Sequence, residues 1–207
     1  MKDISTERMY EIEKILKKSI NEIFPNKRYS VKLTGKSILF LKGTEFLVKN
    51  LIFSLCIAIF LIAIFMAFMF KSVKMIVISL IPNLLPLVFT AGAMGFLGIT
   101  LRPSTILVFT IAFGISVDDT IHFLAKYRQE LWDNKFDDVT KSVFKSLKET
   151  GVSMYYTSIV LFFGFSVFLT SDFGGTIALG GLVSLTLLLA MLTNLLLLPS
   201  LLISFKK

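Results

Sequence analysis

The chain has 207 residues, of which 55% are hydrophobic and 21 are phenylalanine, and its mean hydropathy is +0.78. This composition is too apolar for a soluble globular domain and is typical of a protein that crosses a membrane several times. The net charge of +8 is spread over the amino-terminal segment and the loops. Membrane-flanking lysines explain this charge better than nucleic-acid binding does. The single cysteine, Cys56, rules out an intrachain disulfide.

The amino-terminal segment is predicted to begin with an amphipathic helix over residues 5–24, because its apolar side chains recur at helical spacing. Pro25 and Asn26 end that helix, Tyr29–Leu33 alternates as a short strand does, and residues 36–49 continue as a helix into the membrane. A piece of this size buries little core alone. We therefore interpret residues 1–46 as the tail of a larger domain outside the membrane, with a helix at the lipid headgroups as the alternative.

Long charge-free runs predict five membrane spans within residues 47–205, at about 49–70, 75–98, 103–125, 152–171 and 175–203. Each is near or above the roughly 20 residues that a helix needs to cross a bilayer. The predicted fold is an all-α polytopic membrane protein with a small α/β piece at its amino terminus.

The distribution of lysine and arginine predicts the orientation of the spans. Lysines gather after the first span, in residues 126–150 and at the carboxyl terminus, whereas the loop before the third span holds only Arg102. The positive-inside rule places the basic loops and the carboxyl terminus in the cytoplasm and residues 1–48 outside. Exporting a segment as basic as 1–48 calls for an earlier span to lead it. Residues 126–150 are expected to form one or two interfacial helices, with Trp132 at headgroup level.

Two adjacent aspartates, Asp118 and Asp119, lie in the third span, which is otherwise uncharged and also holds the only histidine, His122. An ionised carboxylate at mid-bilayer depth costs about 2.5–3.5 kcal/mol on insertion scales, so such residues are functional by default. On a helix, Asp118 shares a face with Gly114 and His122, and Asp119 precedes His122 by three residues. We expect these groups to titrate as one proton-exchanging cluster, next to space left by Gly114.

The sequence leaves three other interpretations of the aspartates. In the first, the pair serves only as polar contacts between helices. The Asp119-x-x-His122 spacing also suits a metal, but no second cluster of ligands accompanies it. An intramembrane aspartyl protease needs carboxylates that converge from different helices, which adjacent positions do not provide. The sequence therefore predicts no catalytic residue, no metal and no cofactor apart from the proton gradient.

The second span contains Pro82-Asn83-Leu-Leu-Pro86. Prolines interrupt backbone hydrogen bonding, which a membrane tolerates only where helices pack together or line a cavity. Pro82 and Pro86 are therefore either a hinge or a packing feature, and Asn83 is positioned to bond to the aspartate helix. In the last span, Thr193-Asn194 is predicted to be buried.

Four motifs in the same order carry a resemblance to a known family. The segment Gly114-Ile-Ser-Val-Asp118-Asp119-Thr-Ile-His122 resembles the fourth-helix motif of the resistance–nodulation–division (RND) superfamily, in particular its MMPL-type branch. Three further segments agree with it: Val31-Lys-Leu-Thr-Gly35, Ile81-Pro-Asn-Leu-Leu-Pro86 and Thr193-Asn-Leu-Leu-Leu-Leu-Pro199. The five-helix block is also similar to sterol-sensing domains of the same superfamily.

The resemblance implies helices two to six of one RND half, with residues 1–46 as the end of a porter-like domain. It implies a proton-coupled exporter of lipids or other hydrophobic compounds in the cell inner membrane, in which Asp118 and Asp119 relay protons and His122 modulates them. It also implies a partner, either a second RND half or another copy of the chain. A sterol- or lipid-sensing module without transport and an inactive remnant are the alternatives.

Overall fold

The computed structural model describes residues 6–24, 29, 31–133 and 138–205. Within these residues the secondary structure is helical, which confirms the predicted all-α polytopic fold. Five helical stretches are long and apolar enough to cross a membrane. In chain order the elements are α1 (Thr6–Ile23), α2 (Lys36–Phe70), α3 (Val73–Phe96), α4 (Pro103–Asp133), α5 (Val139–Ser166), the 3₁₀ turn η1 (Val167–Thr170), α6 (Gly174–Leu192), the π-helix η2 (Thr193–Leu197) and α7 (Leu198–Ser204).

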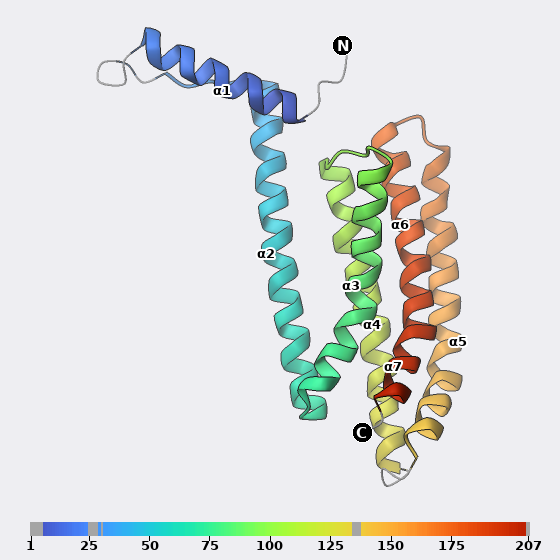
Figure 1. The fold of residues 1–207 in the computed structure, drawn as a ribbon. Coiled ribbons are helices and arrows are strands. Elements are labelled where there is room, and N and C mark those ends of the chain that lie inside the picture. The colour runs from blue at the N-terminus through green and yellow to red at the C-terminus, as the bar shows by residue number, and fades with distance from the viewer. Residues whose placement is uncertain (1–5, 25–28, 30, 134–137, 206–207) are drawn as a thin grey trace.

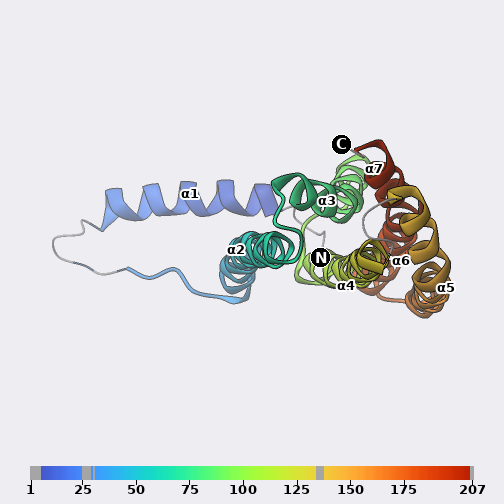
Figure 2. The ribbon, with the colours of Figure 1, turned by 90° about the horizontal axis from the view of Figure 1, so that it is seen from below.

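The spanning helices run side by side along one direction, with α1 lying across the beginning of α2 (Figure 1). Helix α6 packs against α3, α4 and α5, whereas α2 stands at the edge of the bundle and contacts α3 and α4 (Figure 2). The turn between α2 and α3, the end of α4 and the end of α7 lie at one end of the bundle, which we call the basic end because it holds Lys71, Lys74 and Lys126. The opposite end is called the α1 end.

Ion pairs join α4 to α5 at the basic end. The carboxylate of Glu130, which is only 1% exposed, lies 3.1 Å from Lys126 Nζ and 2.7 Å from Lys145 Nζ, and Lys126 Nζ lies 2.6 Å from Glu149 Oε2. A charge that is withdrawn from water needs such partners. Asp138 accepts a hydrogen bond from the backbone N–H of Lys141 and so caps the start of α5.

One local prediction is wrong. Tyr29, Val31, Lys32 and Leu33 take no regular structure, because a strand needs a partner for its backbone groups, and the described residues offer none. The helical residues within 126–150 belong to the ends of the long helices, since α4 continues to Asp133 and α5 begins at Val139, and an interfacial position for them stays a prediction. The Glu130 ion pairs explain why both helices continue past their apolar segments. The predicted stop at Pro25 and Asn26 lies outside the described residues.

Gly180 of α6 lies at a close contact between helices. A Cβ atom at this position would lie 2.5 Å from Phe168 Cβ and 2.7 Å from the carbonyl oxygen of Phe165. Glycine at position 180 therefore lets α6 approach the end of α5 and η1 more closely than a residue with a side chain would.

We expect Gly180→Ala to destabilise the bundle by about 1–3 kcal/mol, since the added methyl group has no space and the backbone must shift. Gly164→Ala in α5 is the matched control, because a Cβ atom there meets nothing within 4 Å. Thermal unfolding in detergent measures both. Equal unfolding midpoints for the two variants would show that the close approach at Gly180 does not limit packing.

Candidate functional site

The two aspartates face different surroundings. Asp119 is buried at 9% exposed, whereas the side chain of Asp118 is 73% exposed, as is that of His122. His122 Nε2 lies 3.5 Å from Asp118 Oδ1. The compact three-group cluster expected from the sequence is thus divided, with Asp118 and His122 paired on an outer face and Asp119 inside the bundle. The 100° step between successive helical residues causes this division.

The outer face of α4 carries a polar stripe. Thr110, Gly114, Asp118 and His122 follow one another at four-residue spacing, and all four are exposed. The space next to Gly114 is open, since a Cβ atom there would meet nothing within 4 Å. A membrane-spanning helix thus presents a carboxylate, an imidazole and an uncovered backbone position on its outer surface.

The carboxyl group of Asp119 has no hydrogen-bond or ion-pair partner among the described residues. Its sequence neighbours on the same side of α4, Ser116 and Thr120, are each 1% exposed and are fully hydrogen-bonded. Asp119 therefore differs from Ser116 and Thr120 in its hydrogen bonding, and buried polar groups are normally paired. Asp119, which is 9% exposed, has no such bond among the described residues.

A cluster of four buried polar residues, which we call the amide cluster, joins α3, α4 and η2. The Ser116 hydroxyl donates to Asn83 Oδ1 at 2.7 Å. The amide of Asn194 reaches the Ser116 carbonyl oxygen at 3.2 Å, and its Oδ1 lies 2.8 Å from Thr120 Oγ1. Thr120 Oγ1 also lies 3.0 Å from Asn83 Oδ1 and 3.0 Å from the Ser116 carbonyl. A hydroxyl carries a single hydrogen, so the cluster has more than one way to arrange its donors.

Asn83 therefore bonds to the aspartate helix through Ser116 and Thr120 rather than through the aspartates. Sequence reasoning named Asn83, Thr193 and Asn194 but missed Ser116 and Thr120. The sequence does contain a signal for Ser116 and Thr120. They are two hydroxyl residues four apart in an apolar span, on the side of the helix where Asp119 lies.

The two prolines of α3 do not end the helix, which continues from Val73 to Phe96 and changes direction along its length (Figure 1). Pro86 has no N–H, so the carbonyl of Pro82 lacks its helical donor. The hydroxyl of Thr193 lies 3.0 Å from that carbonyl oxygen and also 2.9 Å from the carbonyl oxygen of Ala190. A side chain of η2 thus replaces the hydrogen bond that proline removes from α3.

The π-helix η2 explains how adjacent residues reach two different helices. The backbone N–H of Leu198 bonds to the carbonyl of Thr193, which is the five-residue step of a π-turn. Pro199 follows, and its missing N–H favours such a local widening. From this turn Thr193 bonds to α3 and Asn194 to α4.

We expect Thr193→Val to cost about 1–3 kcal/mol of stability, because it leaves the buried Pro82 carbonyl without a donor. Pro86→Ala restores an N–H one helical turn after Pro82 and should recover part of that loss in the double variant. Thr170→Val, which removes only an exposed local hydroxyl bond, is the control. Unfolding midpoints of the wild type, the two single variants, the double variant and the control test this coupling. If the two changes simply add, the proposed hydrogen-bond replacement is wrong.

Comparison with known proteins places the chain in a family. The sequence profile of the MMPL family matches residues 2–205. A protein from Methanocaldococcus jannaschii, whose name describes it as a membrane protein, is 25% identical over 159 residues, which make up 77% of this chain and 40% of that relative. No solved structure matches the chain. The profile match covers nearly the whole sequence, and the chain belongs to the MMPL family.

Proposed function

We propose that this chain is part of a proton-coupled exporter of lipids or other hydrophobic compounds, and that Asp119 is its buried proton site. The observation that carries the proposal is a side chain with a carboxyl group, only 9% exposed, in a membrane-spanning helix, with no hydrogen bond or ion pair among the described residues. Ionisable groups in membrane spans are costly and mark ion or proton pathways by default.

Asp119 is well situated to couple protonation to helix position. Ser116 and Thr120 of the same helix segment hold α3 and η2 through the amide cluster. A change of charge at Asp119 alters the cost of burying this part of α4. The amide cluster has more than one arrangement of its hydrogen-bond donors. The hydrogen bonds between α4, α3 and η2 can therefore rearrange without all of them being lost.

Asp118 and His122 serve in this proposal as the proton-exchanging pair on the outer surface of α4. Their 3.5 Å separation allows a shared proton or a bridging water, and both are accessible from outside the bundle. His122 acts as the modulator, since it contacts Asp118 directly. The amino-terminal segment and the α1 end lie outside the cytoplasm in this proposal, and the basic end lies inside, in accord with the positive-inside rule.

A partner covers the polar stripe of α4 in the working protein. Lipid tails offer no hydrogen bonds to Asp118 and His122, and a small residue such as Gly114 allows a second helix to approach closely. The partner is another copy of this chain or a second RND half. No enzymatic activity is assigned to any residue, and no cofactor is required besides the proton gradient.

The proton site is tested by infrared titration of the purified membrane protein. We expect one carboxylic acid band that changes with pH in the wild type and in Asp118→Asn to be lost in Asp119→Asn, because Asp119 is buried without the ion pairs that hold the buried Glu130 carboxylate. Asp172→Asn, which changes an exposed carboxylate in the connection before α6, is the control.

Transport is tested with the same variants in the intact assembly, reconstituted with a fluorescent phospholipid and an imposed pH gradient. Asp119→Asn should reduce gradient-dependent lipid movement to the level of empty vesicles, while Asp172→Asn behaves as the wild type. Movement that persists in Asp119→Asn contradicts the proposal. Lipid binding that is indifferent to both pH and the Asp119 change, without movement, favours a lipid-sensing module instead.

The partner surface is tested by cysteine cross-linking in a Cys56→Ser background. We expect Gly114→Cys to form disulfide dimers on oxidation if the partner is a second copy, or to resist a membrane-permeant maleimide if it is a different half. Val160→Cys on the exposed face of α5 is the control for an uncovered position in a membrane-spanning helix, and its reactivity is the reference for Gly114→Cys. Equal maleimide reactivity of the two cysteines would show that nothing covers the stripe.

A further inference from the structure

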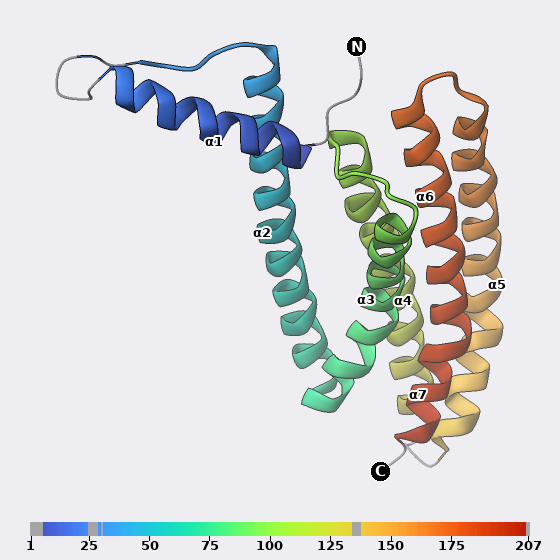
Figure 3. The same ribbon diagram turned by 45° about the horizontal axis from the view of Figure 1, so that its top comes forward.

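The turn between α2 and α3 lies at the surface of the bilayer. Both helices are long and apolar enough to span a membrane, and only residues 71 and 72 separate them. The uncharged run of α2 ends at Phe70, and that of α3 begins at Met75. Figure 3 shows this turn at the end of the bundle opposite to α1. Lys71 is exposed and therefore lies at the level of the lipid headgroups.

A second cation, from α4, lies beside this turn. The guanidinium carbon of Arg128 is 5.8 Å from the centre of the Phe70 ring, which is within the range of a cation–π contact. The same ring stacks on Tyr127, with 6.3 Å between the ring centres. Because Phe70 directly precedes Lys71, cationic side chains from two helices lie next to the end of α2. A guanidinium held in this way presents N–H donors in the planar arrangement that matches a phosphate.

Within the described residues, no carboxylate forms an ion pair with either of these two cations. Lys126 and Lys145 at the same end of the bundle pair with the buried Glu130, whereas Lys71 and Arg128 belong to none of the ion pairs found there. A cation at headgroup level that has no partner in the protein attracts anionic lipid. The α2–α3 turn and Arg128 thus offer a positively charged surface to the membrane.

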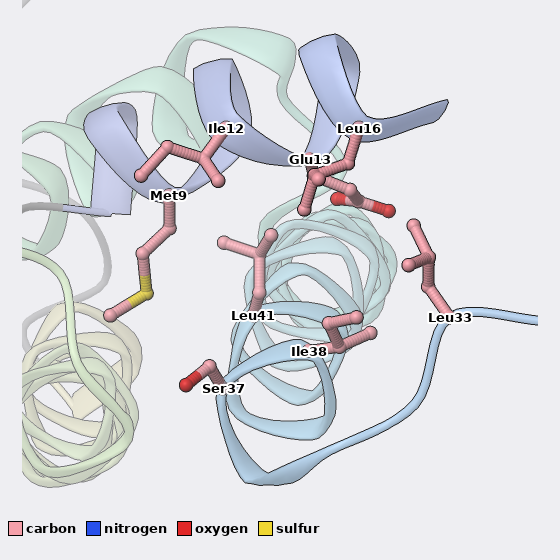
Figure 4. Close-up of a pocket in the computed structure, with 8 residues that line it drawn as sticks. All are labelled: Met9, Ile12, Glu13, Leu16, Leu33, Ser37, Ile38 and Leu41. Atoms are coloured by element: carbon pink, nitrogen blue, oxygen red, sulfur yellow. The ribbon is translucent and has the colours of Figure 1, made fainter. Parts of the chain in front are cut away.

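The pocket where α1 crosses the beginning of α2 offers no such charge (Figure 4). Its volume is about 220 Å³, and Glu13 is the charged residue among the described residues that line it. The Glu13 carboxylate lies 2.7 Å from Lys17 Nζ. An anionic headgroup is therefore favoured at the α2–α3 turn and not in this pocket.

Exposed apolar side chains of α2 continue from the turn into the hydrocarbon layer. Leu61, Ile64 and Phe68 recur at spacings of three and four residues, and all three are exposed. Phe68, at 84% exposed, ends this stripe three residues before Lys71. A phospholipid with its headgroup at Lys71 can therefore lay an acyl chain against α2.

We propose that the α2–α3 turn and Arg128 together bind the headgroup of a phospholipid that carries a net negative charge. Lys71 and the Arg128 guanidinium contact its phosphate, and its acyl chains lie against α2. A zwitterionic headgroup brings an ammonium group that both cations repel, so it gains less from this surface. The bound lipid joins α4 to the end of α2, whichever side of the membrane the basic end faces. The inference is independent of proton coupling at Asp119.

The test is native mass spectrometry of the full chain, released from micelles that contain equal amounts of phosphatidylglycerol and phosphatidylcholine. We expect the wild type to retain phosphatidylglycerol in preference to phosphatidylcholine. Each of Lys71→Gln and Arg128→Gln should lower this preference about fivefold, which is the contribution of one cation beside an anionic headgroup. Lys148→Gln, which removes an exposed charge from α5 at the same end, is the matched control and should leave the preference unchanged. Equal loss in all three variants, or no preference in the wild type, would overturn the proposal.

A further variant and a stability measurement separate headgroup binding from packing. Arg128→Lys keeps the charge, so it should retain most of the preference. A loss as large as that in Arg128→Gln would attribute the effect to packing on Phe70 and contradict binding through charge. In thermal unfolding, phosphatidylglycerol should raise the midpoint of the wild type more than phosphatidylcholine does, and this difference should vanish when Lys71→Gln and Arg128→Gln are combined. An undiminished difference in the double variant would place the bound lipid elsewhere.

Discussion

The bundle depends on one constraint: a backbone carbonyl freed by proline must find a donor inside the protein, because hydrocarbon offers none. Pro86 frees the carbonyl of Pro82, and Thr193 supplies the donor from η2. The widened turn that precedes Pro199 puts Asn194 beside Thr193, and Asn194 bonds to α4. A side chain of η2 therefore compensates the proline interruption of α3, and the hydrogen bonds of Thr193 and Asn194 join η2 to α3 and α4 beside Asp119.

This arrangement separates the two aspartates into different chemical roles. The hydrogen-bonded residues Ser116 and Thr120 turn one side of α4 toward α3 and η2, and Asp119 lies on that side. Asp118 and His122 consequently face away from the bundle. One face of α4 packs against α3 and η2 through buried polar side chains, and the opposite face exposes polar side chains. Helix α4 can therefore contact this bundle on one side and a partner on the other.

The number of spans and the all-α class could be predicted from the lengths of the uncharged runs alone. A helix needs about 20 apolar residues to cross a bilayer, and such runs are visible in the sequence. The strand at Tyr29–Leu33 could not be decided from alternation, since strand formation depends on a pairing partner elsewhere. The continuation of α4 and α5 past their apolar segments depends on Glu130 meeting Lys145 across two helices, which helical periodicity does not reveal. Spacing placed Asp118 with His122 correctly, but the burial of Asp119 required knowing where α3 and η2 lie.

Helix α2 links the two ends of the molecule. Its buried residues form two groups, Leu41 and Thr44 near α1 and Ile62 and Met66 near the basic end. The groups lie about 30 Å apart along the helix. Met66 belongs to the same apolar core as Phe123 of α4, one turn from Asp119. Between its two packed regions α2 is mostly exposed, so it has few contacts that resist tilting. The packing of α2 against the rest of the bundle is therefore concentrated toward the basic end, in the core that also holds α4.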